Sequence, residues 1–332
     1  MKGIIKFKVS DNKLLYQFEL KRNITILQGI SANGKTTLLR MLIEATEEGT
    51  SLIYKVETNA RYYVFSGTSQ GSGWKESLYD KTDTVIFIEE NNRFVYSKEF
   101  AEFVKTSGNY FVIVGRKPIN TLPYSIQEIY TLISYKPENS LKRVYEFKEL
   151  YSNFEFINTD FDLIITEDAK SGYEFYQHLF SNISVISANG NSNILNTIDS
   201  VDKHNILCIV DGAAFGSYLQ DYYEDFENDI YIDKRITFWM PESFEYVILE
   251  AGVVTFRELP DILLNPSAYI ECKEFPSWER YFTYLLIEKS DQRYKYKKSS
   301  LDPYYLQEKN MKKVIEVMPE EIKNYFQQKN HE

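Results

Sequence analysis

The chain has 332 residues, with 43% hydrophobic and 26% charged side chains, a composition that excludes wholesale disorder and collagen-like fibres. At roughly 100–200 residues per domain, this length predicts two domains. The net charge of −10 is unevenly distributed along the chain. Residues 1–150 hold 21 basic residues (Lys and Arg) and 17 acidic residues (Asp and Glu), whereas residues 151–250 hold 4 basic and 18 acidic residues. Residues 251–332 hold 13 of each kind. We therefore expect a boundary near residue 150 and an acidic region that repels phosphate backbones unless bound cations reverse the local field.

The chain lacks the marks of a membrane or secreted protein. No run approaches the roughly 20 apolar residues of a membrane-spanning helix, and the first residues alternate like a strand rather than a signal peptide. We expect a cytoplasmic protein with no membrane partner. Two cysteines, Cys208 and Cys272, and three histidines make no disulfide framework and no His-rich zinc site, so carboxylates would hold any metal, as magnesium, manganese or calcium.

The N-terminal region predicts a phosphate-binding loop. Ile4 to Val9, Leu14 to Leu20 and Asn23 to Leu27 have the pattern of strands. The third strand leads into Gly29 to Thr36, whose sequence GISANGKT fits G-x-x-x-x-G-K-[ST], the Walker A motif, without a mismatch. Thr37 to Ile43 then has helical character. Strand, loop and helix therefore follow in the required order.

The residue types of this loop suit a nucleotide. Gly29 and Gly34 allow the backbone N–H groups to wrap a phosphate, Lys35 supplies charge to the β- and γ-phosphates, and the Thr36 hydroxyl can ligate magnesium. The predicted cofactors are ATP or GTP with Mg²⁺ or Mn²⁺, and the alternative is an unrelated glycine turn. The predicted nucleotide-binding residues are Gly29, Asn33, Gly34, Lys35, Thr36 and Thr37.

An acidic strand end completes the predicted nucleotide site. Val85 to Ile88 predicts a buried strand followed by Glu89 and Glu90, which we assign to catalysis, with Glu89 as the magnesium-side residue. A solvated strand end is the alternative. The next buried strand, Tyr110 to Val114, is followed by Arg116, which is either a sensor of the γ-phosphate or a surface arginine.

This layout resembles ATP-binding-cassette-like ATPases, the group that includes structural-maintenance-of-chromosomes proteins and overcoming-lysogenization-defect nucleases. The resemblance covers residues 1–40 well and residues 83–116 loosely. No LSGGQ-type signature lies between the two motifs, and residues 69–73 are a poor substitute. The resemblance implies that a signature from another protomer completes the site, so its absence here predicts slow hydrolysis by the isolated chain.

After a polar, irregular stretch at residues 136–160, strands alternate with helices. This alternation predicts a parallel sheet with right-handed crossovers, whose ligands gather beyond the carboxyl ends of the strands. The predicted strands are Asp162 to Thr166, Ser184 to Ala188, Ile206 to Val210 and Arg235 to Met240, with helices through Tyr176 and about Ile194 to Ile198.

Acidic residues follow three of these strands. Glu167 and Asp211 are expected at the same sheet edge, and Glu242 and Glu245 join them from the fourth strand. Clustered carboxylates repel one another unless a divalent cation neutralises them, so we predict a magnesium site there. Asp168 is expected to cap the following helix.

This region resembles the Toprim fold of topoisomerases, primases and overcoming-lysogenization-defect nucleases. The resemblance implies an acid-base or metal role for Glu167, a metal role for Asp211, and auxiliary ligation by Glu242 and Glu245. Family members place a second aspartate where this chain has Ala213. The fold class predicted is α/β, with a P-loop NTPase domain (residues 1–150), a Toprim-like domain (residues 151–250) and a C-terminal extension (residues 251–332) packed on the second domain.

Three functions remain open at this point. The leading hypothesis is an ATP-regulated, Mg²⁺-dependent nuclease for DNA or RNA, and the resemblance implies phage defence or mobile-element biology. The second is a nucleotide-dependent sensor with a degenerate acidic site, and the third is a nucleotide or phosphoryl-transfer enzyme that acts on a small molecule. A homo-oligomer or partner ATPase is possible in each case. Arg293 to Lys298 interleaves basic and aromatic residues as a nucleic-acid contact does, or is a solvated turn.

Overall fold

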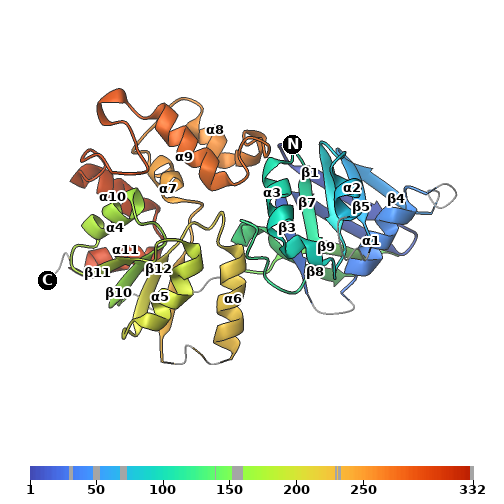
Figure 1. The fold of residues 1–332 in the computed structure, drawn as a ribbon, viewed down its shortest axis with the longest axis horizontal. Helices are drawn as coiled ribbons and strands as arrows, with labels where there is room; N and C mark the ends of the chain where they lie inside the picture. The colour runs from blue at the N-terminus through green and yellow to red at the C-terminus, as the bar shows by residue number, and fades with distance from the viewer. Residues whose placement is uncertain are drawn as a thin grey trace. The chain divides into compact units, whose positions relative to one another are not determined.

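The chain forms two compact units (Figure 1). Unit 1 comprises residues 1–152 and 265–277, and unit 2 comprises residues 153–264 and 278–332. Residues 265–277, which the sequence analysis grouped with the second domain, thus belong to unit 1. The structure is a computed structural model and describes residues 1–29, 33–47, 53–67, 73–138, 140–151, 160–228, 230 and 233–329.

Unit 1 is built on a nine-stranded mixed sheet in the order β4-β1-β2-β9-β8-β3-β7-β6-β5. The strands β8, β3, β7, β6 and β5 pair in parallel, whereas β1 pairs with β2 and β4, and β8 with β9, in antiparallel fashion. The elements are β1 (Ile5–Ser10), β2 (Leu14–Leu20), β3 (Ile24–Gln28), α1 (Lys35–Glu44), β4 (Lys55–Thr58), β5 (Arg61–Phe65), α2 (Gly73–Leu78), β6 (Thr84–Ile88), η1 (Arg93–Tyr96), α3 (Lys98–Thr106), β7 (Tyr110–Val114), η2 (Ile126–Glu128), β8 (Ile129–Tyr135), β9 (Arg143–Glu149) and η4 (Pro266–Ala268).

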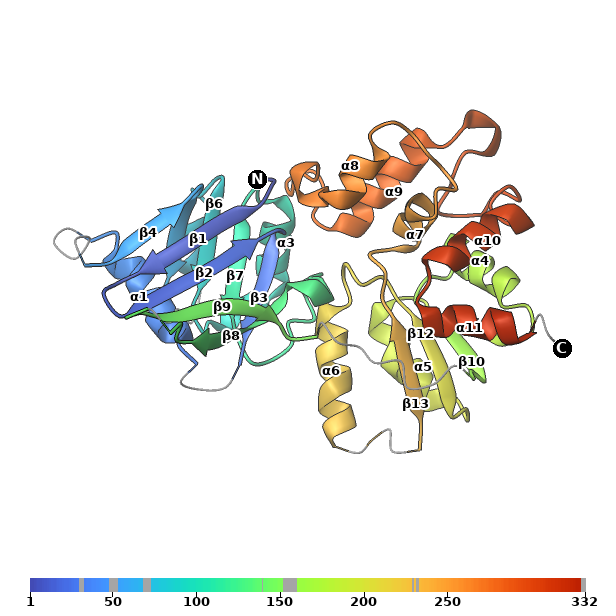
Figure 2. The ribbon, with the colours of Figure 1, turned by 180° about the vertical axis from the view of Figure 1, so that it is seen from behind.

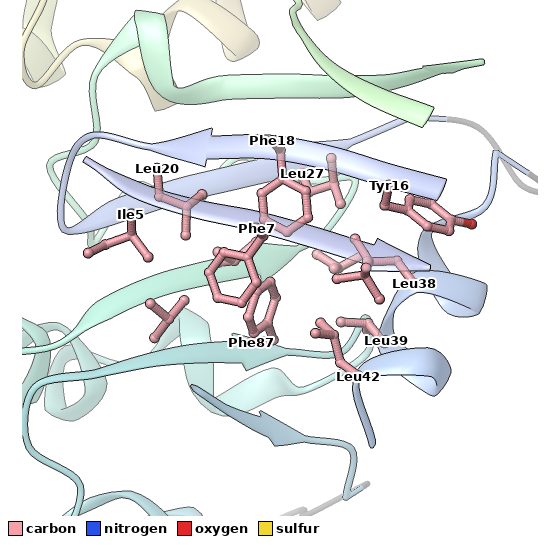
Figure 3. Close-up of a cluster of buried hydrophobic side chains, with 14 of the residues drawn as sticks. Ile5, Phe7, Tyr16, Phe18, Leu20, Leu27, Leu38, Leu39, Leu42 and Phe87 are labelled. Carbon is pink, nitrogen blue, oxygen red and sulfur yellow. The ribbon is translucent and has the colours of Figure 1, made fainter. Parts of the chain in front are cut away.

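Two hydrophobic clusters cover the parallel strands, one on each face. Alternate residues of a strand point to opposite faces, so Val85 and Phe87 of β6 enter one cluster while Ile86 and Ile88 enter the other. The first cluster joins these strands to α1 and to β1 and β2, as Figure 3 shows for Phe87 and its neighbours. The second contains residues of α2 and α3. The helices therefore lie on both faces, as parallel strands require.

Unit 2 is built on a four-stranded parallel sheet in the order β11-β10-β12-β13. Figures 1 and 2 show α5 on one face of this sheet and α11 on the other. The elements are β10 (Leu163–Thr166), α4 (Ser171–Leu179), β11 (Ser184–Ser187), η3 (Asn191–Asn193), α5 (Ile194–Ser200), β12 (Asn205–Ile209), α6 (Gly216–Glu227), β13 (Arg235–Trp239), α7 (Phe244–Glu250), α8 (Leu259–Leu264), α9 (Trp278–Lys289), η5 (Gln292–Tyr294), α10 (Glu308–Val317) and α11 (Glu320–Lys329).

The fold is mixed α/β, as predicted, and both sheets are rich in parallel pairs. The predicted strands are confirmed to within about two residues at each end. The prediction of an irregular stretch at residues 136–160 was wrong in part, because β9 lies within it. Among the helices of the described residues, none is long and apolar enough to cross a membrane.

Candidate functional site

The phosphate-loop motif connects β3 to α1 at the carboxyl edge of the parallel strands. Its two glycines have φ angles of 134° (Gly29) and 93° (Gly34), which side-chain-bearing residues rarely adopt. Helix α1 is held by Leu38 and Leu42, both fully buried in the first cluster. Residues 30–32 of the motif lie outside the described residues, and so does most of the stretch 69–73 that was weighed against the missing signature.

Lys35 lies at the first position of α1 and is only 6% exposed. Its Nζ donates a hydrogen bond to the Gly29 carbonyl at 2.7 Å, so the side chain folds back over the loop. Burial lowers the pKa of Lys35, and Arg116 lowers it further, while Glu90 opposes both. A phosphate at this position would favour the charged form of Lys35 and replace the carbonyl contact.

The other predicted loop residues surround Lys35. Asn33 has its Nδ2 atom within 3.1 Å of the position that a Cβ on Gly29 would take. Thr36 is exposed at the start of α1, where its hydroxyl is accessible to a cation. Thr37 acts on the hydroxyl of Tyr16 and lowers its pKa, although burial raises that pKa overall.

Glu89 and Glu90 follow β6, which is separated from β3 by the single strand β7. Both carboxylates are partly exposed. Arg116, just after β7, places its Nε 2.7 Å from Oε1 of Glu90, so this arginine pairs with the acidic strand end. A cleft of about 970 Å³ opens here, lined by both glutamates and by residues after β7. Glu90 and Arg116 of this charged cleft also act on Lys35 of the loop.

In unit 2, Glu167 and Asp211 follow the neighbouring parallel strands β10 and β12. Both acids therefore lie at one edge of the sheet, as the sequence predicted, and the charge of Glu167 acts on Asp211. Gly212 makes this geometry possible, because a Cβ there would lie 2.5 Å from the Met240 carbonyl oxygen. Its N–H donates to the Pro241 carbonyl at 2.6 Å, which fixes Asp211 at the end of the sheet.

The environment of this pair favours bound protons. Burial raises the pKa of Glu167 to about 7, and the neighbouring Glu279 acts in the same direction. Burial and the Glu167 charge raise the pKa of Asp211 well above its usual range. Both residues are only partly exposed. The pair thus holds an excess of negative charge that a proton or a cation must compensate.

Of the two auxiliary acids, Glu245 acts on this group through its charge. Ser243 caps α7 by accepting from the Tyr246 N–H, and Glu245 in the first turn is 1% exposed. Its Oε1 accepts a hydrogen bond from the Tyr296 hydroxyl at 2.8 Å, and its charge acts on Asp211. Glu242 instead acts on the pKa of Glu250.

Asp168 has the capping role expected of it. Its carboxylate accepts hydrogen bonds from the N–H groups of Lys170 at 3.0 Å and Gly172 at 2.7 Å, in the first turn of α4. Asp168 therefore positions the helix that follows Glu167.

Two residues that were not predicted for this site also interact with it, Glu279 and the cationic Lys298. The Nζ atom of Lys298 lies 2.6 Å from Oε1 of Glu279 and 3.9 Å from Oε1 of Glu245. Burial alone would lower the pKa of Lys298, but the two carboxylates outweigh it and raise the pKa. The basic stretch after residue 292 contained this lysine, but nothing in the sequence distinguished a lysine directed at carboxylates from a solvent-facing one.

The same geometry changes the interpretation of Arg293 to Lys298. Tyr296 is 1% exposed and donates to Glu245, so it belongs to the core. Arg293 is paired with Asp291, with Nη2 2.8 Å from Oδ2. Because Lys298 is directed at carboxylates as well, the stretch is not a continuous basic-aromatic surface, although Arg293 and Lys297 are exposed. A contact with nucleic acid there stays a prediction, with a solvated turn as the alternative.

The donor set fits a hard cation in part. Magnesium commonly binds one or two carboxylates and completes its shell with water and substrate oxygens, and Glu167 with Asp211 can supply the carboxylates. Within the described part of the chain, no three His, Cys, Asp or Glu side chains are grouped closely enough to hold a metal by themselves. The pair would therefore bind a cation weakly until a phosphate adds its oxygens.

No protein-family model matches this chain, and no curated protein matches it.

Proposed function

We propose that this protein is a nucleotide-regulated, Mg²⁺-dependent nuclease that acts on DNA or RNA in the cytoplasm. In this proposal, unit 1 is a P-loop NTPase domain of the ATP-binding-cassette-like type, and unit 2 is a Toprim-like domain in a reduced form of the overcoming-lysogenization-defect arrangement. The observation that carries it is the meeting of Glu167 and Asp211 at one edge of the parallel sheet.

The residues of unit 2 suit phosphodiester hydrolysis. A divalent cation bound there would polarise the phosphodiester and lower the pKa of attacking water. Glu167, with a pKa of about 7, can accept and return a proton at neutral pH. Asp211 would hold the cation, and Lys298 would offer positive charge to a phosphate oxygen once it leaves Glu279.

Unit 1 would supply regulation through the nucleotide. Lys35 would bind the phosphates, Thr36 and Glu89 the magnesium ion, and Glu90 would orient water after releasing Arg116. Because the chain has no LSGGQ-type sequence between its two motifs, hydrolysis by the isolated chain would be slow, and a second copy or a partner ATPase would accelerate it.

A sensor without nuclease activity is the second candidate. Two observations favour it: Ala213 stands where the Toprim pattern has a second aspartate, and Lys298 already compensates part of the negative charge. A site of this kind would report nucleotide binding to a partner without cutting a substrate.

One experiment separates the two candidates. Purified protein is incubated with plasmid DNA and with tRNA in Mg²⁺ or Mn²⁺, with and without ATP. We expect cleavage that Glu167→Gln abolishes and that Lys35→Ala uncouples from ATP, whereas Asp199→Asn, which removes an exposed carboxylate from α5, has no effect. ATP binding without cleavage under any condition would favour the sensor.

A further inference from the structure

Residues 265–277 form an inserted segment, which belongs to unit 1 although the chain on both sides of it belongs to unit 2. The chain leaves unit 2 at the end of α8, passes through the inserted segment and re-enters unit 2 at the start of α9. A movement of unit 1 is therefore passed through the chain to the first residues of α9.

The inserted segment is held to unit 1 near both of its ends and in its middle. Near its start, the Ser267 carbonyl accepts a hydrogen bond from the Gly3 N–H at 2.6 Å. In its middle, the Cys272 side chain is buried in the first cluster. Near its end, the buried side chain of Asn23 donates from Nδ2 to the Pro276 carbonyl at 3.0 Å. The segment therefore moves together with the sheet of unit 1.

Asn23 connects the inserted segment to the strand that carries the phosphate loop. It directly precedes β3, and the loop follows the other end of this strand. The first four residues of β3 are buried, and the strand pairs with β7 and β8. Because a close-packed interior transmits a displacement instead of absorbing it, a shift of the loop and β3 would carry Asn23 and Pro276 with it.

The inserted segment ends close to Glu279 in the sequence. Only Ser277 and Trp278 separate Pro276 from Glu279, and three Cα–Cα steps span at most about 11 Å. Glu279 lies in the first turn of α9, where its Oε1 is 2.6 Å from Nζ of Lys298. A charged hydrogen bond of this length is already at its shortest, so a displacement of Glu279 lengthens it.

Lys298 connects this ion pair to the acidic pair of unit 2. Its Nζ also lies 3.9 Å from Oε1 of Glu245, and its charge acts on Glu167 and Asp211. When Glu279 moves away, one negative charge leaves the neighbourhood of the acidic pair and Lys298 is released from its nearest partner. Both changes would alter the field in which a cation and a phosphate bind.

We infer that the inserted segment couples nucleotide binding in unit 1 to the acidic pair of unit 2 by moving Glu279 away from Lys298. This inference rests on the nucleotide binding in the proposed function and adds the route of its regulation. Coupling between two sites typically changes an equilibrium by about 5–150-fold. The first turn of α9 should respond, because it loses the contact that Glu279 makes there.

The test measures hydrogen–deuterium exchange of the full chain by mass spectrometry. Mg²⁺ is present throughout, and an ATP analogue with an imido β–γ bridge is added or omitted, so the difference reports the nucleotide alone. We expect the analogue to accelerate exchange in residues 278–289 about fivefold or more, since exchange reports local opening. Residues 194–200, which form α5, should not respond.

Two variants interrupt the proposed route at different points. A Gly-Ser-Gly insertion between Ser277 and Trp278 lengthens the connection and keeps the hydrogen bonds of the inserted segment. The analogue should then change the exchange of α9 by less than about twofold. Asn23→Ala removes the hydrogen bond to Pro276 and should also reduce the response. Both variants should bind the analogue like the wild type in calorimetry.

Each variant has a matched control. The same insertion between Asp202 and Lys203, two exposed residues between α5 and β12, lengthens unit 2 away from the route. Asn109→Ala removes another buried asparagine side chain of unit 1, whose Nδ2 donates to the Lys81 carbonyl at 2.8 Å. Both controls should keep the wild-type response of α9. Melting temperatures verify that every variant is folded.

Three results would contradict the inference, and they differ in meaning. If the analogue accelerates the exchange of α9 equally in the wild type and in the variant lengthened after Ser277, the inserted segment is not the route and the inference is overturned. If the wild type binds the analogue without faster exchange in α9, the coupling fails while nucleotide binding stands. If the wild type does not bind the analogue, the proposed nucleotide function fails, and the coupling fails with it.

Discussion

Lys298 brings a positive charge into the carboxylate group of unit 2. In Lys298→Met, Glu245 and Glu279 would lose the positive charge that both of them contact. Removing one partner of a buried ion pair costs about 3–5 kcal/mol of stability. Because the Lys298 side chain is 38% exposed, solvent screening reduces this to about 1–3 kcal/mol. We expect urea denaturation to show this loss for Lys298→Met and no loss for Lys297→Met, which changes the exposed neighbour. Equal stability of both variants would contradict the ion-pair assignment.

The pKa of Glu167 predicts how a cation changes stability with pH. A carboxyl that titrates near 7 when folded and near 4.5 when unfolded binds more protons in the folded state, so stability falls as pH rises from about 4.5 to beyond 7. The loss is on the order of 3 kcal/mol. When Glu167 has lost its proton, bound Mg²⁺ or Mn²⁺ would compensate the resulting negative charge.

The cation should therefore raise the melting temperature more at pH 8 than at pH 5.5. Glu167→Gln carries no charge to compensate, so its melting temperature should be higher than that of the wild type at pH 8 without divalent cation and should respond little to Mn²⁺. Differential scanning fluorimetry measures all of these shifts. A cation effect that is the same at both pH values would rule out this site.

At the scale of elements, the strands were predictable wherever they are buried on both faces. All residues of β6 and β7 are buried, so both strands are continuous apolar runs that the sequence displays. Strand β9 was missed because it is half-exposed and carries charged residues such as Arg143 and Lys148. Its position between β2 and β8 depends on pairings that no local pattern reveals.

The residues of the candidate site, like the strands, were predictable where a local sequence pattern marks them. The placement of Glu167 and Asp211 at one sheet edge was predictable, because parallel strands end at one edge and each acid comes shortly after the end of its strand. The roles of Glu279 and Lys298 were not, because they come from the first turn of α9 and from the segment after η5, whose packing on the sheet is set by tertiary contacts. Glu242 and Glu245 were both predicted as auxiliary metal ligands. In the structure, Glu242 comes before α7, whereas Glu245 lies in the first turn of this helix.

The loop after β12 gives a prediction at the scale of elements. Gly212→Ala would place a Cβ 2.5 Å from the Met240 carbonyl oxygen, so the ends of β12 and β13 must separate and Asp211 must move away from Glu167. We expect a loss of about 1–3 kcal/mol in unfolding free energy and weaker Mn²⁺ binding by calorimetry. Gly115→Ala is the control, because no heavy atom lies within 4 Å of its added Cβ. Unchanged Mn²⁺ affinity in Gly212→Ala would show that this loop does not position the acids.

For the whole molecule, charge is divided between the two units. Residues 1–150 carry +4, and residues 265–277 contribute one positive and two negative charges, so unit 1 carries +3. The total of −10 then leaves −13 on unit 2. A phosphate chain that reaches Glu167 and Asp211 must therefore enter a repulsive field, which a divalent cation would reduce locally.

This division predicts that nucleic-acid binding depends on divalent cations as well as on salt. At constant ionic strength, a fluorescently labelled oligonucleotide should bind the wild type more tightly in Mg²⁺ than in EDTA. The double variant Glu167→Gln, Asp211→Asn removes both titratable carboxyl groups and with them the negative charge of the site, so it should bind in EDTA at least as tightly as the wild type does in Mg²⁺, yet cleave nothing. Asp199→Asn with Asp202→Asn removes two exposed charges of unit 2 outside the site and should leave the Mg²⁺ dependence intact. Anisotropy titrations measure each affinity.

If the control pair removes the Mg²⁺ dependence as fully as the site pair does, the cation acts on the general field of unit 2, and the assignment of substrate phosphates to Glu167 and Asp211 is wrong.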